Sequence, residues 1–162
     1  MVELEAIDMS LSEEEIIPKL MNNLRNVGFL TLSNIEGYDE GEHFNAVQAF
    51  YKDIPQDDRD RMIWRHHRPQ NTNYYRGIAP FVNNNKAHKE FYDMGGSLSL
   101  VSDEALRYPL YEKSPFPEQE EVQWIKLTYE KYYNLFHSVS LKLLEYMAIG
   151  LGKDREFFHQ WF

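Results

Sequence analysis

The stretch PEQEEVQWIKLTYEKYYNLFHSVSLKLLEYMAI, residues 117–149, decides the fold that we expect for this chain. Apolar and aromatic side chains recur along it every third or fourth residue: Val122, Ile125, Tyr129, Tyr132, Phe136, Val139, Leu143 and Met147. This period places all of them on one face of an α-helix. We therefore predict one long amphipathic helix, roughly 45–50 Å in length at the usual rise per residue.

The residues after this helix are unusual for the end of a chain. GLG, residues 150–152, should stop the helix, and KDREFFHQWF, residues 153–162, could form one more helical turn or two. Chain ends tend to fray and to be polar, whereas each Phe or Trp gains roughly 1.5–3 kcal/mol on burial. Either this aromatic ending docks on the body of the domain, or a further part of the protein covers it.

Upstream, the chain opens with an extended segment followed by a helix. Ile7 is the apolar anchor of the extended segment, and Ser10 with Glu13, or Ser12 with Glu15, could form a capping box. Helical spacing then relates four apolar residues: Ile17, Leu20, Leu24 and Val27.

The limits of this first helix are marked by a proline and a glycine. Pro18 deep inside a helix would cost about 3 kcal/mol, so we predict that the regular helix begins near it. Gly28 is placed for a left-handed cap at the other end. FLTLSNI, residues 29–35, then alternates apolar with polar residues and predicts a strand.

Shorter elements are expected in the middle of the chain. A second helix should run from about Gly41 to Lys52, with an apolar face made of Phe44, Val47 and Phe50 or Tyr51. Pro55 begins another short helix, whose acidic first turn suits the helix dipole. Residues 64–117 predict irregular structure with at most two short strands, near NYYRGIAPF (73–81) and KEFYDMGG (89–96).

Bulk composition fits one globular domain, residues 1–162. The hydrophobic content of 43% and the aromatic content of 15% are ample for a core. A formal net charge of -9 argues against a nucleic-acid surface, because phosphate neutralisation needs clustered Lys and Arg. RDRMIWRHHR, residues 59–68, is a basic exception that we interpret as a solvated connector.

Several other classes of protein are excluded or disfavoured. The chain has no cysteine, so thiol catalysis, disulfides and Cys-ligated zinc are excluded. No apolar run approaches the roughly 20 residues that a membrane span requires, and MVELEAIDMS lacks the features of a secretory signal. We expect a cytoplasmic protein with neither a membrane nor a nucleic acid as partner.

Three residues form a candidate metal set. His88 and Glu90 lie two positions apart and would share one face of a strand, and His137 is a possible third ligand. Two histidines and a carboxylate are the ligands of non-haem Fe(II). However, His137 lies on the long helix among aromatic residues, so we favour solvated strand residues for the pair and a helix-face histidine for His137.

Arg76 is the more interesting polar residue. In NYYRGIAPF its guanidinium follows Tyr74 and Tyr75 and precedes the flexible Gly77. A planar fork of donors beside aromatic rings is a common way to bind a carboxylate. An arginine stacked on tyrosine at the surface is the alternative, and residues and spacing alone define no catalytic centre.

Taken together, several stretches resemble the isopenicillin N synthase-like 2-oxoglutarate/Fe(II) oxygenases, the non-haem dioxygenase family. AIDMS and NVGFLTLSNI are similar to the opening of that family, and FYKDIPQDDRDRM to its Phe-Phe-x-Leu-Pro helix. YYRGI stands where the family often has Tyr-Arg-Gly-Tyr, with Ile78 in the last place, and KEFYDMGG resembles its Lys-Glu-x-x-Asp-x-Gly segment. YPLYEKSPFP and LLEYMAIGLGKDREFF follow in the same order as in the family.

The resemblance implies an incomplete enzyme. In the family, the segment like GLGKDREFF precedes a double-stranded β-helix, or jelly roll, that holds iron with His-x-Asp and a distant His. It also carries an Arg-x-Ser that binds 2-oxoglutarate, and none of these motifs has a counterpart here. We therefore predict an α+β fold: the helix-rich N-terminal region of such an oxygenase, with one long C-terminal helix, a few short strands and the catalytic barrel missing.

Function follows from the same resemblance. Fe(II) and 2-oxoglutarate are expected for the full-length family member, with no cofactor bound by this chain and no catalytic or metal-ligating residue in it. The resemblance implies that Tyr75, Arg76 and Phe91 line the pocket of a small-molecule substrate. The expected partner is the C-terminal jelly-roll half, or a second copy through the exposed apolar face. The alternative is a non-catalytic standalone module that binds a protein partner through its aromatic C-terminal face.

Overall fold

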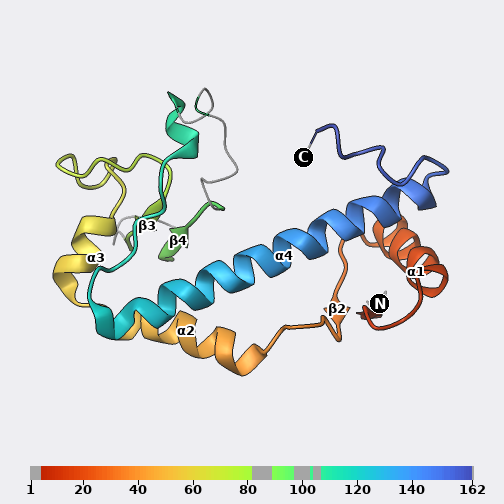
Figure 1. The fold of residues 1–162 in the computed structure, drawn as a ribbon, viewed down its shortest axis with the longest axis horizontal. Coiled ribbons are helices and arrows are strands. Elements are labelled where there is room, and N and C mark those ends of the chain that lie inside the picture. The colour runs from red at the N-terminus through yellow and green to blue at the C-terminus, as the bar shows by residue number, and fades with distance from the viewer. Residues whose placement is uncertain (1–4, 82–88, 97–102, 104–106, 162) are drawn as a thin grey trace. The chain divides into compact units, whose positions relative to one another are not determined.

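The chain forms two compact units. Unit 1 comprises Met1–Glu40 with Tyr132–Phe162, and unit 2 comprises Gly41–Lys131. The long helix α4, Gln123–Gly150, contributes residues to both (Figure 1). The single domain expected from chain length stays a prediction. The computed structural model describes these residues: 5–81, 89–96, 103 and 107–161.

Unit 1 packs helix α1, Glu13–Asn26, with a small parallel sheet and the second part of α4. The sheet pairs β1, Ile7–Asp8, with β2, Leu32–Ser33. β2 is shorter than the strand predicted for residues 29–35. The buried core residues come from β1, α1 and α4: Ile7, Ile16, Leu20 and Tyr146. Leu32 of β2 is partly buried and packs against them.

Both ends of α1 carry the signals that the sequence predicts. The Glu15 carboxylate accepts a hydrogen bond from the N–H of Ser12 at 3.2 Å, which confirms the second of the two possible capping boxes. Gly28 has a φ of 78°, and its N–H donates to the carbonyl of Asn23 at 3.1 Å. The predicted left-handed cap is therefore confirmed.

The prediction that α1 begins near Pro18 is wrong. The helix begins at Glu13 and contains Pro18. Acidic residues fill the first turn, where the helix dipole favours negative charge. Ile16 and Leu20, on either side of the proline, are fully buried. Their burial, together with the dipole, offsets the hydrogen bond that a proline inside a helix cannot donate.

Unit 2 contains two helices close to their predicted limits. α2 runs over Glu40–Lys52, and α3 over Gln56–Met62 with Pro55 as its N-cap residue. α2 buries Ala46, Ala49 and Phe50. The expectation that Phe44 belongs to this face is wrong, since Phe44 is 59% exposed. Phe44 precedes Ala46 by two residues, a spacing that turns its side chain away from the buried stripe.

The two strands predicted for the middle of the chain are present in unit 2. β3, Gly77–Ala79, and β4, Phe91–Asp93, pair antiparallel, with Ile78 opposite Tyr92 (Figure 1). Ile78 also forms an isolated parallel bridge with Ile63. The core that joins this sheet to the helices consists of Ala49, Phe50, Ile54, Met62, Ile78 and Ile125.

Helix α4 confirms the long amphipathic helix, with shorter limits than predicted. It begins at Gln123, after the 3₁₀ turn η4 (Glu120–Val122), and ends at Gly150. Ile125 and Tyr132 are almost fully buried, as the predicted apolar face requires, whereas Phe136 on the same face is 37% exposed. Among the described residues, no helix has the length and apolar character that crossing a membrane requires.

Residues 151–161 form successive turns, not the additional α-helical turns that we predicted. The N–H of Phe157 donates to the carbonyl of Asp154 at 2.9 Å, and that of Trp161 to Phe158 at 3.1 Å. The aromatic rings of this ending contact one another, with 5.4 Å between the centroids of Phe157 and Trp161. Even so, Phe157 is 37% exposed and Trp161 is 59% exposed. The ending is therefore not enclosed in the core of unit 1.

Arg155 ties these turns to the rest of unit 1. Its Nη2 donates to both carboxylate oxygens of Glu13 at 2.6 and 2.7 Å, and its Nη1 to Glu145 at 3.1 Å. His159 Nε2 lies 3.3 Å from the other oxygen of Glu145. Hydrogen bonds to Glu13 and then to Glu145 raise the pKa of Arg155 further above its usual value. The attachment is electrostatic.

Gly77→Ala should strongly destabilise the protein. Gly77 has a φ of 110°, and an added Cβ would lie 2.1 Å from the main-chain oxygen of Met62. Strain and collision together should lower the free energy of unfolding by at least about 3 kcal/mol, measured by urea denaturation. Gly37→Ala is the control, since Gly37 has a φ of 79° with open space around it and should lose only about 1–2 kcal/mol. Equal losses would contradict the collision.

Pro18→Ala should stabilise the protein. It restores a donor inside α1 and removes the clash of the ring with the preceding turn, a defect of about 3 kcal/mol. Part of this gain is lost because proline restricts the unfolded chain, so we expect a net increase of about 1–2 kcal/mol in urea denaturation. Pro69→Ala, in an exposed loop, should instead be neutral or slightly destabilising. A decrease for Pro18→Ala would show that the helix is not strained there.

Candidate functional site

The predicted substrate contacts lie around the two-stranded sheet of unit 2. Gly77, the first residue of β3, pairs with Asp93, the last residue of β4. Tyr75 and Arg76 lead directly into β3 at this end of the sheet, whereas Phe91 begins β4 at the opposite end. The structure therefore brings all three residues to one sheet, with Phe91 roughly 7 Å along the strand from the residue that faces Gly77.

Alternation along β4 gives neighbouring side chains different roles. Tyr92 packs against the core of unit 2 and donates its hydroxyl to the carbonyl of Pro115 at 2.7 Å. Burial raises the pKa of Tyr92 far above its usual value, so the phenol stays protonated. Phe91 points to the other face, where its ring meets Trp64 edge-on at 5.3 Å. Phe91 remains partly exposed and can line a surface.

Glu112 holds the main chain that precedes β3. One oxygen of its carboxylate accepts the N–H of Tyr74 at 2.8 Å. The other accepts the N–H groups of Tyr75 at 2.5 Å and Arg76 at 2.7 Å. Glu112 follows the 3₁₀ turn η3, Pro109–Tyr111, far along the sequence. No local spacing connects the two segments, so sequence analysis missed Glu112 completely.

The guanidinium of Arg76 donates hydrogen bonds to main-chain carbonyls of the protein. Nη1 donates to the carbonyl of Met94 and Nη2 to that of Leu110, both at 3.2 Å. A Cβ at Gly95 would lie 3.0 Å from the guanidinium carbon, so the arginine packs closely against this glycine. Nε is buried without a hydrogen-bond partner in the part of the chain that the structure describes. Arg76 thus joins three segments, with two of its five N–H donors used in these bonds.

Asn73 is a second residue that sequence analysis missed. Its side-chain amide donates to the carbonyl of Arg76 at 2.5 Å and to that of Met62 at 3.1 Å. These bonds satisfy main-chain acceptors beside Gly77, where the positive φ turns the chain into β3. An Asn that braces a turn is a common signal, but the sequence does not show which carbonyls it meets.

Comparison with known proteins relates this fold to oxygenases. Over 136 residues, 83% of this chain, the sequence is 27% identical to isopenicillin N synthase of Amycolatopsis lactamdurans. The fold matches a Caulobacter crescentus protein assigned to the 2OG-Fe(II) oxygenase family with a TM-score of 0.72, over 98% of this chain at 20% identity. A full-length Neurospora crassa protein, solved in complex with alpha-KG, matches with a TM-score of 0.69 over 96% of this chain, also at 20% identity. No family model matches the chain.

The resemblance predicted from the sequence is confirmed. The chain spans about half the length of these relatives: 41% of the synthase, 52% of the Caulobacter protein and 49% of the Neurospora protein. These shares fit the predicted N-terminal half of an isopenicillin N synthase-like oxygenase. The mixture of helices with small sheets is common to the chain and these oxygenase folds.

Two of the three candidate metal ligands, Glu90 and His137, lie in the described residues. Glu90 forms an ion pair with Arg59, and both side chains are mostly buried. His137 belongs to unit 1, where it is exposed and stacks on Tyr133 with 6.5 Å between ring centroids. His88 lies outside the described residues. Within the described ranges, no three His, Asp or Glu residues come together as metal ligands.

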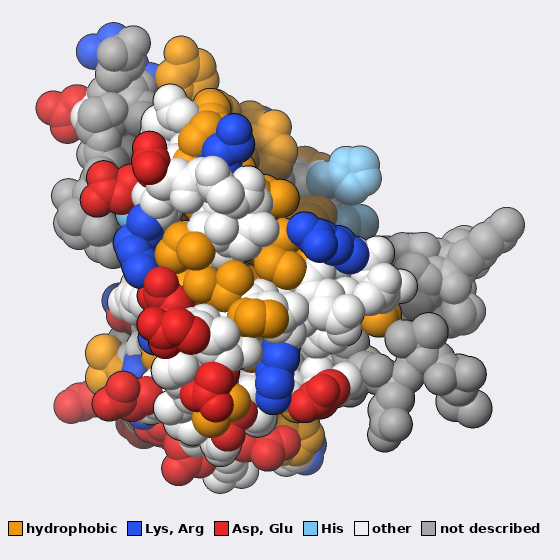
Figure 2. All heavy atoms as spheres, turned by 90° about the vertical axis from the view of Figure 1, so that its right-hand side faces the viewer, with side chains coloured by type: hydrophobic (Ala, Val, Ile, Leu, Met, Phe, Trp, Pro, Cys, Tyr) orange, Lys and Arg blue, Asp and Glu red, His pale blue; other side chains and the backbone are white. Residues whose placement is uncertain are grey.

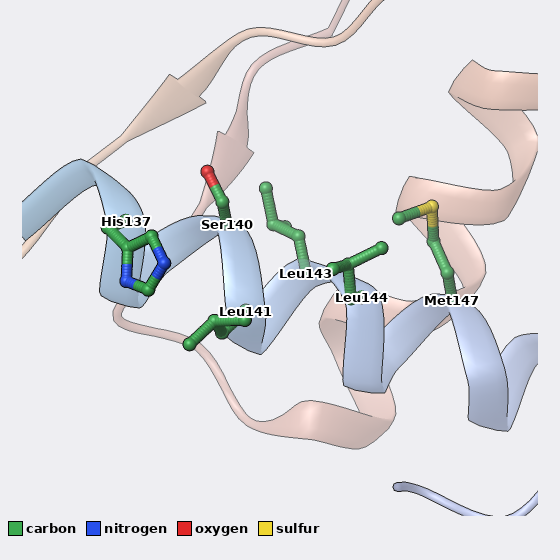
Figure 3. Close-up of a pocket in the computed structure, with 6 residues that line it drawn as sticks. All are labelled: His137, Ser140, Leu141, Leu143, Leu144 and Met147. Carbon is green, nitrogen blue, oxygen red and sulfur yellow. The ribbon is translucent and has the colours of Figure 1, made fainter. Parts of the chain in front are cut away.

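An open hollow of about 350 Å³ lies along the unit 1 part of α4. Figure 3 shows that all its lining residues come from this helix: His137, Ser140, Leu141, Leu143, Leu144 and Met147. Apolar side chains elsewhere are also open to solvent, and Figure 2 shows several of them on one face with acidic and basic side chains around them. The hollow is mainly apolar, and it supplies no convergent polar groups of the kind that a small-molecule site usually has.

Glu90→Gln should destabilise unit 2. The Arg59 side chain is 16% exposed, and it would keep its charge after losing the carboxylate. We expect the free energy of unfolding to fall by about 1–3 kcal/mol in urea denaturation. Adding Arg59→Met should recover much of this loss in a double-mutant cycle. Additive losses would show that the two side chains do not interact.

Proposed function

We propose that this chain is the N-terminal scaffold and substrate-pocket region of a 2-oxoglutarate/Fe(II)-dependent oxygenase that oxidises a small molecule. In this proposal the jelly-roll barrel with the catalytic centre lies outside these residues. The observation that carries it is the combined likeness to oxygenases, in sequence over 83% of the chain and in fold over 96–98% of it. One fold can host many functions. The sequence match to isopenicillin N synthase therefore supports the oxygenase proposal more specifically than the fold does.

Tyr75, Arg76 and Phe91 are the proposed pocket wall. Tyr75 is 53% exposed and can present its ring to a ligand. Arg76 binds two main-chain carbonyls and has donors left for a substrate carboxylate. Phe91 lies partly exposed at the other end of the same sheet. Together they would offer apolar contact and one positive charge, a combination suited to a small carboxylic acid.

Fe(II) and 2-oxoglutarate are proposed to bind outside these residues and to supply the oxidising chemistry there. The sequence contains no His-x-Asp pair, and Glu90 of the one His-x-Glu pair is occupied by Arg59. What the chain itself contributes is a rigid wall. The buried core around Phe50 and Ile78 holds β3 and β4 in place, and Glu112 fixes the segment before β3.

A standalone module that binds a protein partner is not favoured. The exposed Phe157 and Trp161 are compatible with it, but the relatives found by sequence and by fold are oxygenases. Exposed aromatic residues are equally expected where another part of the same protein covers them. Self-association through this surface stays a prediction.

The 162-residue chain alone should form no succinate. It should be incubated with Fe(II), 2-oxoglutarate and ascorbate, and succinate formation compared with the same mixture without protein. Robust protein-dependent succinate would overturn the proposal that this chain is only a scaffold. Stoichiometric Fe(II) binding that is lost in His88→Ala would instead support an iron site within the chain.

The reading frame beyond Phe162 gives the complementary test. The proposal expects it, or a separate chain, to encode His-x-Asp followed by a distant His, and the assembled protein should then decarboxylate 2-oxoglutarate. Arg76→Met in that protein should leave 2-oxoglutarate turnover without substrate unchanged. Turnover coupled to a carboxylate substrate should fall roughly tenfold or more, since one charge-assisted contact is lost. A stop after Phe162 with no partner chain would contradict the proposal.

A further inference from the structure

Three consecutive main-chain N–H groups converge on one carboxylate in unit 2. The donors are Tyr74, Tyr75 and Arg76, and the acceptor is Glu112, with distances of 2.5–2.8 Å. Successive N–H groups that point to one place form an anion-binding concavity. Hydrogen bonds to a charged acceptor are stronger than those between neutral groups. The arrangement is therefore a built anion site that the chain fills with its own side chain.

The anion site is held from both sides. The Glu112 side chain binds the main chain of residues 74–76, and the Arg76 side chain in turn binds the main chain of Leu110, just before Glu112. The carbonyl of Arg76 is bound by Asn73, which fixes the orientation of the following peptide. Main-chain donors cannot turn away as side chains do. If the Glu112 carboxylate is removed, the three N–H groups lose the acceptor that they share.

The chemistry of the site selects carboxylates. Its donors are three neutral main-chain N–H groups, and a carboxylate offers two oxygens that can share them. Two oxygens of one carboxylate divide the three donors between them. Tyr74 and Tyr75 carry half-exposed rings next to the site, so it lies at the surface and a soluble anion can reach it.

We propose that the N–H groups of residues 74–76 form a carboxylate-binding site, and that Glu112 occupies it as the positioning residue of the substrate-contact segment. Glu112 sets where the Tyr75 ring and the Arg76 guanidinium lie. Its role toward substrate rests on the proposed function, whereas the site itself does not. The ligand class is a carboxylate, and Glu112 is the one supplied by the chain.

Amide hydrogen exchange on the 162-residue chain tests this directly. In Glu112→Ala the amides of Tyr75 and Arg76 should exchange roughly tenfold faster or more, because each loses a hydrogen bond to a charged acceptor. The amide of Trp64, bonded to the carbonyl of Ile78 at 2.9 Å, should be unchanged and is the internal reference. Glu118→Ala, at an exposed position in the same connecting segment, is the matched control and should alter neither amide.

Acetate distinguishes an anion site from a simple loop contact. In Glu112→Ala, added sodium acetate should slow exchange at Tyr75 and Arg76 and move their amide NMR signals back toward the wild-type positions. Sodium chloride at the same concentration should not. A variant that acetate does not rescue, or that chloride rescues equally, would overturn the carboxylate site. Unchanged exchange in Glu112→Ala would overturn the role of Glu112.

A second variant covers the case in which alanine unfolds the region. If the Trp64 amide also loses protection in Glu112→Ala, the measurement is repeated with Glu112→Gln. Glutamine keeps the size of glutamate and one acceptor oxygen but not the charge. Faster exchange at Tyr75 and Arg76 with Trp64 unchanged supports the site, and wild-type exchange contradicts it. These measurements need neither Fe(II) nor turnover, so their failure is distinct from failure of the succinate assay.

Discussion

Burial of one face of α4 is the constraint on which both units depend. Near its start the helix places Ile125 in the core of unit 2, and near its end it places Tyr146 in the core of unit 1. Each side chain of this size gains roughly 1.5–3 kcal/mol on burial. The shorter helices add few buried apolar side chains to these cores: Ile16 and Leu20 from α1, Ala46, Ala49 and Phe50 from α2, and Met62 from α3.

The features that the sequence predicted correctly are those that neighbouring residues determine. The apolar period of α4, the capping box of α1 and the glycine at position 28 each depend on residues that are close together in the sequence. Such features can be predicted without knowledge of tertiary contacts. Pro18 was misjudged because its penalty is local but the burial of Ile16 and Leu20 that offsets it is not. Phe44 was misjudged because an apolar residue can remain exposed where its helix position faces solvent.

The candidate site could be predicted only in part, because contacts between segments far apart in the sequence cannot be read from local patterns. A resemblance to known sequences could mark Tyr75, Arg76 and Phe91, since these lie within short motifs. The residues that hold them, above all Glu112, act through contacts between segments that no periodicity connects. Arg76 shows the consequence. A guanidinium expected to await a ligand already joins Met94 and Leu110, so its geometry depends on structure that its own neighbours in sequence do not encode.

The way in which Arg155 attaches the aromatic ending has a consequence for how the protein behaves in different buffers. The contacts with Glu13 and Glu145 are exposed, and exposed ion pairs are screened over about 8 Å at physiological ionic strength and about 3 Å at 1 M. A concentrated kosmotropic salt such as sulfate therefore weakens the ion pairs that hold the segment with Phe157 and Trp161, while it strengthens the burial of apolar surface. High concentrations of such a salt should thus favour aggregation of the folded protein through these aromatic rings.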